Sequence, residues 1–107
     1  MSYKIIEQVN IYHKQGTSSQ YPPSGYASWM EYWRYWVGSR DGTSVRCAIQ
    51  GCSEDATDGA HVQLTRGCDT TYIIPVCRSC NSSGKSSTSL KMQVNRGIRA
   101  VRDDLED

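Results

Sequence analysis

Phenylalanine is absent from this chain of 107 residues, prolines number only three, and long hydrophobic runs are missing. No segment approaches the roughly 20 apolar residues that a membrane-spanning helix needs, so we expect no membrane partner. The first residues also lack the basic segment and apolar stretch of a secretory signal peptide. We therefore expect a cytoplasmic protein.

A strong net charge is missing too, because 12 Lys and Arg stand against 11 Asp and Glu and the formal net charge is +1. The distribution is less even, since the sequence from Cys77 to Val101 contains basic residues and no acidic one. These basic residues are Arg78, Lys85, Lys91, Arg96 and Arg99. Such a segment predicts contact with nucleic-acid phosphates, and ordinary scattered charge on a solvated segment is the alternative.

A chain of this length has room for a single domain, residues 1–107, with a small core that often needs a disulfide or a metal. Cytoplasmic thiols stay reduced and five cysteines cannot all pair, so a metal is the better candidate. Two close pairs, Cys-x4-Cys and Cys-x2-Cys, are separated by 24 residues. This spacing predicts a tetrahedral structural Zn²⁺ site formed by Cys47, Cys52, Cys77 and Cys80.

Two further residues bear on this site. Cys68 lies outside both pairs, and we expect it to be a free, partly exposed thiol. His61 is an alternative fourth ligand, because three cysteines and one histidine also form zinc sites. We rank the four-cysteine set above it, since both cysteine pairs are complete.

Three segments show the alternation or composition of β-strands. Apolar residues at alternate positions predict a strand within residues 3–13. Residues 60–64 and 71–76 predict an antiparallel hairpin, with a glycine in the connecting loop. Pro75 predicts that the second of these strands lies at an edge of the sheet or ends there.

The remaining non-helical segments are loops or stay undecided. Residues 16–25 and 40–44 carry the Gly, Ser, Asp and Pro typical of loops and turns. Residues 81–89 are rich in serine and give no firm element. Residues 90–101 form either a strand or a helix, broken at Gly97.

Residues 28–38 carry the clearest helix pattern. Ser28 and Glu31 stand at the hydroxyl and acidic positions of a capping box, and Gly38 ends the segment. One helical face repeats aromatic residues, namely Trp29, Tyr32, Trp33 and Trp36. This stripe predicts a helix packed on the zinc domain, and a platform that stacks nucleic-acid bases is the alternative.

A histidine and an asparagine complete the cysteine pattern. His61 stands in the run Ala-His-Val between the pairs, and Asn81 ends the run Ile-Ile-Pro-Val-Cys-Arg-Ser-Cys-Asn. Over residues 46–85 this order resembles the zinc-containing branch of the HNH (ββα-metal) endonuclease family. That family has a cysteine pair, a His that ends a strand, a second strand running into Cys-x-x-Cys, and then His or Asn. The chain also looks like small bacterial and phage proteins with a Trp-rich helix before this core.

The resemblance implies a role for several residues in phosphodiester hydrolysis. His61 would be the general base that activates water, and Asn81 a ligand of a catalytic Mg²⁺ or Mn²⁺ ion. Asp58 is the nearest carboxylate for that ion, although it would need a bulge at Gly59 to approach the base. The chain departs from the family at Ala60, where a carboxylate is usual, and at Tyr72, near the place of an Asn that orients the base. For His61, bracing of the zinc knuckle is the alternative role.

These observations predict a small, zinc-stabilised α+β domain in three parts. Residues 1–45 contain an N-terminal strand, a loop and the aromatic helix. Residues 46–89 form an HNH- or treble-clef-like hairpin with zinc knuckles, and residues 90–107 form a C-terminal segment with an acidic end. The predicted function is a zinc-binding HNH-like domain that acts on nucleic acid, as a Mg²⁺-dependent endonuclease if active. The alternative is a catalytically inactive zinc-binding adaptor that contacts protein or nucleic acid.

Overall fold

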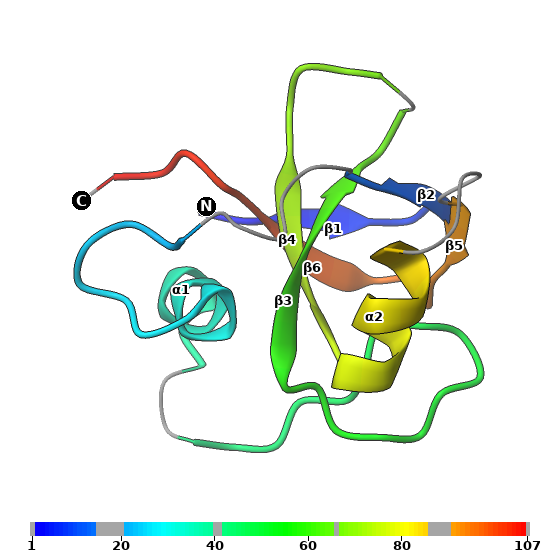
Figure 1. Cartoon of the computed structure of the whole chain (residues 1–107), viewed down its shortest axis with the longest axis horizontal. Helices are drawn as coiled ribbons and strands as arrows, with labels where there is room; N and C mark the ends of the chain where they lie inside the picture. Colours follow the sequence, from blue (N-terminus) through cyan, green and yellow to red (C-terminus); the bar gives the residue numbers. More distant parts are fainter. Residues whose placement is uncertain (1, 15–20, 40–41, 66, 86–90, 107) are drawn as a thin grey trace.

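The computed structural model describes residues 2–14, 21–39, 42–65, 67–85 and 91–106. Within this part of the chain, six strands form one antiparallel sheet in the order β1-β6-β4-β3-β2-β5, accompanied by two helices. The elements are β1 (Lys4–Ile6), β2 (Asn10–His13), α1 (Trp29–Val37), β3 (Asp58–Gln63), β4 (Tyr72–Val76), α2 (Arg78–Lys85), β5 (Lys91–Gln93) and β6 (Ile98–Arg102). The sheet curls, and α1 and α2 lie on opposite sides of β3 (Figure 1).

The N-terminal segment predicted as one strand consists of two. β1 pairs with β6 at one edge of the sheet, whereas β2 pairs with β3 and β5 towards the other edge. The change of partner occurs over residues 7–9, just after the alternation of apolar residues breaks at Ile6 and Glu7. Ile6 and Ile11 are both buried, so each strand contributes to the core. The prediction of a single strand is therefore wrong.

The predicted hairpin is confirmed by β3 and β4, whose antiparallel register is unbroken. β4 lies inside the sheet, between β3 and β6, so the edge alternative is wrong, whereas the end alternative agrees with Pro75 as the last residue but one of the strand. Pro75 is tolerated near the end of β4 because β6 pairs with β4 only at Tyr72 and Ile73, before Pro75 is reached. The Pro75 carbonyl accepts a hydrogen bond from the Ala48 N–H at 2.9 Å, which ties the loop before β3 to this strand.

The aromatic helix is confirmed as α1, with both predicted caps. The Ser28 side chain accepts a hydrogen bond from the Glu31 N–H at 3.1 Å and satisfies one of the free donors at the helix N-terminus. Gly38 ends the helix with φ at 79°, the left-handed conformation that a side chain disfavours. Local sequence signals therefore set both ends of α1.

One face of α1 packs on the sheet. Its buried residues are Met30, Tyr32, Trp33 and Val37. The Trp33 indole N–H donates to the Arg99 carbonyl of β6 at 2.8 Å, so the polar end of this side chain is satisfied as well. Trp29 and Trp36 are half-buried at the border of the same contact. The core interpretation of the aromatic stripe is confirmed.

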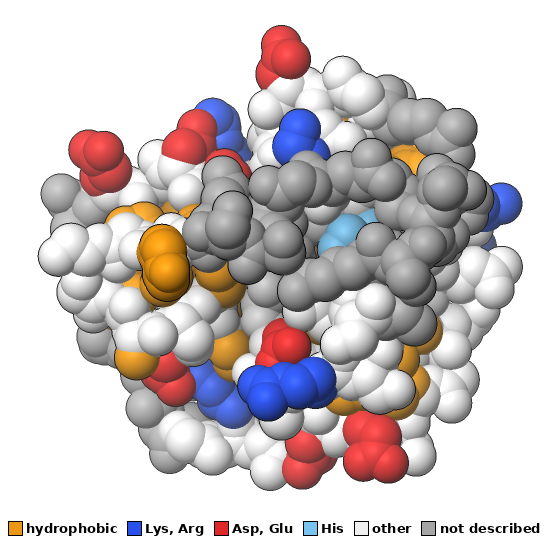
Figure 2. Space-filling view, viewed as in Figure 1, with side chains coloured by type: hydrophobic (Ala, Val, Ile, Leu, Met, Phe, Trp, Pro, Cys, Tyr) orange, Lys and Arg blue, Asp and Glu red, His pale blue; other side chains and the backbone are white. Residues whose placement is uncertain are grey.

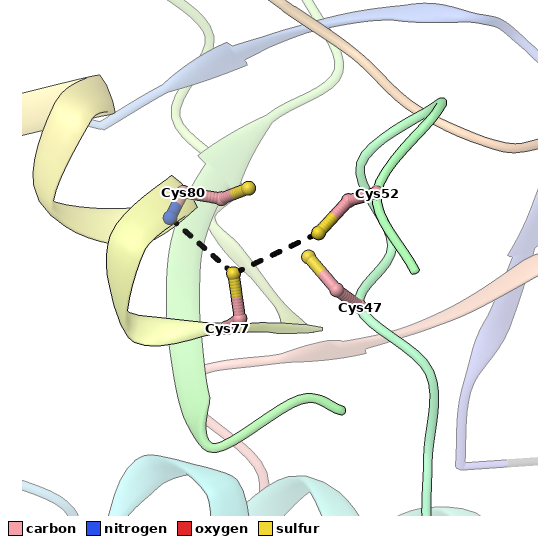
Figure 3. A group of neighbouring side chains, drawn as sticks. All are labelled: Cys47, Cys52, Cys77 and Cys80. Carbon is pink, nitrogen blue, oxygen red and sulfur yellow. Dashed lines mark hydrogen bonds between the residues drawn. The ribbon is translucent and has the colours of Figure 1, made fainter. Parts of the chain in front are cut away.

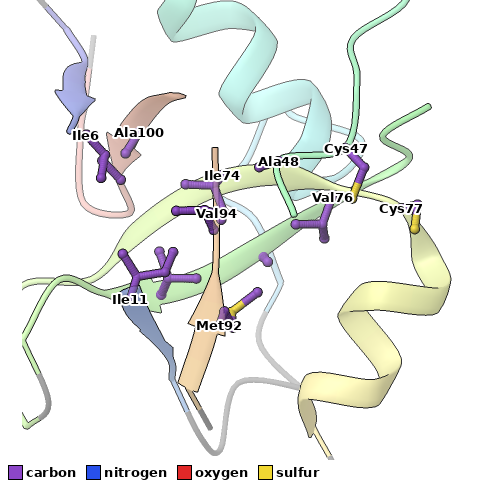
Figure 4. Close-up of a cluster of buried hydrophobic side chains, with 12 residues drawn as sticks. Ile6, Ile11, Cys47, Ala48, Ile74, Val76, Cys77, Met92, Val94 and Ala100 are labelled. Atoms are coloured by element: carbon purple, nitrogen blue, oxygen red, sulfur yellow. The ribbon is translucent and has the colours of Figure 1, made fainter. Parts of the chain in front are cut away.

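Alternate residues of the sheet enter two separate hydrophobic clusters. The cluster shown in Figure 4 consists of Ile6, Ile11, Cys47, Ala48, Ala60, Val62, Ile74, Val76, Cys77, Met92, Val94 and Ala100. The second cluster lies against α1 and receives Ile73 from β4 and Val101 from β6. Because side chains alternate along a strand, even-numbered positions of β3 and β4 face the first cluster and odd-numbered positions face α1.

The C-terminal part of the chain provides two strands and follows a helix that the sequence did not define. β5 and β6 are joined through Gly97, whose φ is 84°, so the strand interpretation of this segment is confirmed and the helix is excluded. α2 occupies the start of the serine-rich segment. Parts of the predicted loops, at residues 16–20 and 40–41, and residues 86–90 lie outside the described residues.

Candidate functional site

Four cysteine side chains converge where three parts of the chain meet (Figure 3). Cys47 and Cys52 come from the loop before β3, Cys77 follows β4 directly, and Cys80 lies in the first turn of α2. Their four sulfur atoms lie within 4.8 Å of one another. The structure therefore brings together all four residues that the spacing predicted.

Backbone hydrogen bonds shape both cysteine pairs. The Cys52 N–H donates to the Ile49 carbonyl at 3.1 Å, which closes the first loop into a tight turn. The Cys80 N–H points at the Cys77 sulfur at 3.4 Å and supports negative charge on that atom. The bond from the first loop to β4, described above, holds the two pairs against each other. The cluster thus depends on the end of the β3–β4 hairpin being formed.

The sulfur positions fit one tetrahedral metal ion. Metal–sulfur bonds of about 2.3 Å place tetrahedral ligands about 3.8 Å apart. The Cys52 and Cys77 sulfurs are 3.9 Å apart. Cys47 and Cys77 are buried, and Cys52 and Cys80 are half-buried. Four protein ligands leave no coordination position for a substrate, which is typical of structural metal sites.

The protonation of these thiols is tied to the metal. Burial raises the pKa of Cys47 and of Cys80 above the ordinary value, because a thiolate is poorly solvated there. The pKa of Cys77 is lowered, and the largest cause is the hydrogen bond from the Cys80 N–H to its sulfur. A divalent cation stabilises all four thiolates and releases their protons on binding. Metal binding and folding are therefore coupled at this site.

Cys68 and His61 do not join the cluster. Cys68 is half-buried in the connection between β3 and β4, and its thiol lies 3.3 Å from the Thr70 carbonyl. His61 lies within β3, away from the four sulfurs that form the metal group among the described residues. The four-cysteine set is therefore favoured over a set that includes His61.

Asp58 and Asn81 form a polar contact between β3 and α2. The Asn81 side-chain amide donates to one Asp58 carboxylate oxygen at 3.1 Å, and Arg78 donates to the other at 3.3 Å. Burial of Asp58 would by itself raise its pKa, but these hydrogen bonds outweigh burial and hold the pKa below the usual value. The Asn81 side-chain oxygen is buried and has no hydrogen-bond partner among the described residues. Carboxylate and amide oxygens are the ligands that Mg²⁺ prefers.

His61 faces the opposite side of β3 from this pair. Its ring packs edge-on against Trp29 of α1, with centroids 4.6 Å apart and an interplanar angle of 82°. His61 lies opposite Ile73 of β4, whose side chain belongs to the hydrophobic cluster against α1. Asp58 is three residues earlier in β3, so its side chain lies on the other face of the strand. His61 is 4% exposed. The structure therefore brings together Asp58 and Asn81 and does not bring His61 to them.

The bulge at Gly59 that Asp58 would need in order to approach His61 is absent. The β3–β4 register passes through Gly59 without interruption, so the alternation of the two faces is kept. A Cβ atom at this position would lie 2.6 Å from the carbonyl carbon of Trp29. The glycine thus serves the close approach of α1 to β3 rather than a bulge.

The candidate nucleic-acid-binding residues lie on separate elements. They are Arg78 and Lys85 in α2, Lys91 in β5, Arg96 in the following turn and Arg99 in β6. The Arg99 guanidinium lies 5.3 Å from the centre of the Tyr3 ring. On the face shown in Figure 2, the acidic and basic side chains of the described residues are mixed and form no continuous patch of one sign.

Sequence reasoning missed the ion pair between Arg78 and Asp58. The two residues are 20 positions apart, and no local pattern links them. The register of the hairpin could have predicted this ion pair. It places Asp58 opposite Val76, and Arg78 follows Val76 by two residues. The start of α2 at the second cysteine pair then turns Arg78 back towards β3.

Comparisons with known proteins give no relative. No protein-family model matches the chain, and comparison with curated proteins and with solved structures finds no match. The HNH-like pattern therefore stays a resemblance carried by the residues named above. In the described part of the chain, the helices are too short or too polar to cross a membrane.

Proposed function

We propose that this chain is a zinc-stabilised binding domain that contacts nucleic acid as an adaptor. The observation that carries the proposal is the closed cluster of four cysteines, which joins the loop before β3, the end of β4 and the start of α2. It supports a structural role for the metal. The position of His61 against Trp29 supports an adaptor, because a general base must reach the proton it abstracts.

Zinc is the metal that best suits this ligand set. Four thiolates in tetrahedral geometry are typical of structural Zn²⁺, and iron is the main competitor for such sites. We expect one zinc atom per chain in the purified protein, measured by elemental analysis. Folded protein with substoichiometric zinc and no other metal would contradict this assignment.

Nucleic acid is the favoured partner for two reasons. The order β3, β4, α2, with the second cysteine pair between β4 and α2, agrees with the ββα order that the HNH-like resemblance implies. Three basic residues after α2, namely Lys91, Arg96 and Arg99, form no ion pair with a described residue. Arg78 is less available, since it is paired with Asp58.

Binding of duplex DNA and of structured RNA at several salt concentrations tests this partner. The affinity should fall with salt, because phosphate contacts release counterions. Combined substitution Lys91→Ala, Arg96→Ala and Arg99→Ala should lower the slope of log K against log salt by up to about 3. Lys4→Ala, a charge removed on β1, is the control and should have a much smaller effect. Absence of binding by the zinc-loaded wild type would leave a protein partner as the adaptor's target.

A second candidate function is a Mg²⁺- or Mn²⁺-dependent endonuclease. The observation in its favour is the buried Asn81 oxygen next to the Asp58 carboxylate, because such a pair is suited to a hard cation. In this candidate His61 is the general base, as the resemblance implies. We rank it second because Asp58 and His61 occupy opposite faces of β3.

Cleavage of plasmid DNA and of structured RNA separates the two candidates. The adaptor predicts no cleavage with either metal. The endonuclease predicts cleavage that His61→Ala lowers by about 10²–10⁴ with zinc content unchanged. Asn81→Ala should then reduce cleavage at low Mg²⁺ and be partly rescued at high Mg²⁺. Cleavage that appears only after Ala60→Asp would indicate a scaffold that lacks one carboxylate.

A further inference from the structure

A surface cleft of about 400 Å³ lies next to the cysteine cluster and has no role in the functions described so far. One wall is the segment from Ser44 to Ala48, which includes the metal ligand Cys47. The other wall is formed by residues at the start of β6 and in the turn before it, namely Asn95, Gly97, Ile98 and Arg99. Trp33 of α1 contributes to the lining. The volume is within the range of sites for small organic molecules.

The charges that line the cleft are all positive. Arg46 comes from one wall and Arg99 from the other, and no acidic residue among the described ones lines the cleft. Both side chains are exposed, and neither forms an ion pair with a described residue. Two arginines that line one cleft suit an anion with several oxygen atoms, because each guanidinium can donate two parallel hydrogen bonds.

The position of Arg99 is set by its surroundings. Its guanidinium lies over the Tyr3 ring at 5.3 Å from the ring centre, a cation–π contact. Its backbone carbonyl accepts the Trp33 indole N–H at 2.8 Å, which fixes α1 against this strand. The cleft therefore offers a partly preorganised cationic group.

The rest of the lining provides polar and apolar groups for the remainder of a ligand. Ser44 and Asn95 add hydrogen-bonding side chains to the two walls, and Val45 and Ile98 add apolar surface. The Asn95 N–H donates to the Ala48 carbonyl at 3.0 Å and so joins the walls at the base of the cleft. A phosphate alone would leave the apolar surface uncovered.

We propose that this cleft binds a small organic phosphate of nucleotide size, with the phosphate between Arg46 and Arg99. The ligand can be a free nucleotide or the phosphorylated end of a nucleic-acid chain, since the recognised chemistry is the same. This site is separate from the Asp58–Asn81 pair. Because Cys47 is part of one wall, the metal holds that wall in place, and the site exists in the zinc-loaded protein.

Titration of the zinc-loaded chain with adenosine 5′-monophosphate tests the proposal, with the Trp33 indole N–H resonance as reporter. Adenosine 5′-monophosphate should bind at least about tenfold more tightly than adenosine, and inorganic phosphate should compete with it. Arg46→Ala and Arg99→Ala should each weaken binding by about tenfold to a hundredfold. Arg99→Lys keeps the positive charge and should still weaken binding, because the fork of donors is lost.

The controls make the result decisive. Lys4→Ala removes a positive charge outside the cleft and should leave the affinity nearly unchanged. Equal binding of adenosine and its monophosphate, or equal binding by the wild type and both arginine-to-alanine variants, would overturn the proposal. Competition by a 5′-phosphorylated oligonucleotide and not by its 5′-hydroxyl counterpart would identify a nucleic-acid end as the ligand. If neither oligonucleotide competes while the monophosphate binds, a free nucleotide is the ligand.

The two proposals share Arg99, so the variants that separate them leave this residue unchanged. Lys91→Ala combined with Arg96→Ala reports on nucleic-acid binding through its salt dependence, whereas Arg46→Ala with the monophosphate reports on the cleft. Loss of one result with retention of the other shows which proposal fails.

Discussion

The five cysteines differ in what surrounds their sulfur atoms. Four sulfurs lie within 4.8 Å of one another, whereas the fifth, in Cys68, donates a hydrogen bond to the nearby Thr70 carbonyl. Removing one ligand from a four-sulfur site leaves three thiols that hold the metal weakly, and the free energy of metal binding is part of the free energy of folding. The structure thus assigns opposite consequences to chemically identical substitutions.

The first prediction compares Cys80→Ser with Cys68→Ser. Cys80→Ser should abolish stoichiometric zinc binding and leave the domain largely unfolded, measured by elemental analysis and by circular dichroism. Cys68→Ser should retain zinc and lie within about 0.5 kcal/mol of the wild type in the free energy of unfolding. A folded, zinc-free Cys80→Ser protein would show that the core does not need the metal.

Gly59 provides the second prediction at this scale. Gly59→Ala places a methyl group against the backbone of Trp29, where the separation would be 2.6 Å. Because backbone atoms cannot rotate away, α1 must shift, and we expect a loss of about 1–3 kcal/mol in the free energy of unfolding by urea. A variant as stable as the wild type would mean that α1 is less tightly held against β3 than the structure indicates.

At the scale of elements, α1 joins three strands of the sheet to the C-terminal segment. It packs against β3, β4 and β6, and its side chains bond to the backbone of β6 and of the segment after it. Its caps and its aromatic periodicity are local, but its stability in the protein comes from this packing, as expected for a helix of nine residues. The helix is therefore part of the core of the domain rather than an appended arm.

Truncation of one aromatic side chain tests this role of α1. Trp33 is 5% exposed, and Trp33→Ala removes both its packing and its hydrogen bond to Arg99. We expect a loss of about 3–5 kcal/mol in the free energy of unfolding. Tyr21→Ala, at a position that is 89% exposed, is the matched control and should be nearly neutral. Unchanged stability of Trp33→Ala with lost partner binding would make the stripe an interface.

At the scale of the whole molecule, Tyr32 joins α1 to the C-terminal segment. Its hydroxyl group donates to the Arg102 carbonyl and accepts from the Leu105 N–H at 2.9 Å. Burial is the largest influence on this group and raises the pKa of Tyr32 to about 12. The neutral phenol is therefore favoured in the folded protein, relative to an unfolded chain in which the pKa is near 10.

This difference predicts a loss of stability at alkaline pH. The contribution of Tyr32 is fully present below pH 10 and is lost as the pH rises towards 12, because the unfolded chain ionises first. Urea unfolding of the zinc-loaded protein should show a free energy that falls over this range. The fall should be smaller in Tyr32→Phe and unchanged in Tyr21→Phe, whose ring is exposed. An equal fall in Tyr32→Phe would assign the alkaline transition to other groups.

Local patterns were sufficient for the metal ligands and for α1. The cysteines occur as two pairs, and each pair spans at most six residues, so the backbone of a short loop can bring its sulfurs together. The ends of α1 at Ser28 and Gly38 likewise depend on hydrogen bonds and dihedral angles within one turn. The β3–β4 hairpin was also predictable, since its strands are neighbours in the sequence as well as in the sheet.

Long-range pairing decided the rest. The alternation of residues 3–13 could not reveal that β1 belongs beside β6 and β2 beside β3, because those partners lie far along the chain. Pro75 is compatible with an inner strand only because β6 ends its pairing with β4 before that residue, which no local signal records.

The residues of the candidate site also differ in whether local sequence or long-range packing sets their positions. The sequence by itself determined that Cys47, Cys52, Cys77 and Cys80 form one cluster suited to a metal ion, because their chemistry and spacing leave few other arrangements. Only the tertiary structure decided the surroundings of His61, Asp58 and Asn81. The unbroken register of β3 and the packing of α1 on Gly59 place His61 against Trp29, while α2 carries Asn81 to Asp58 on the other face. A strand has two faces, and what covers each of them is set by elements far away in the sequence.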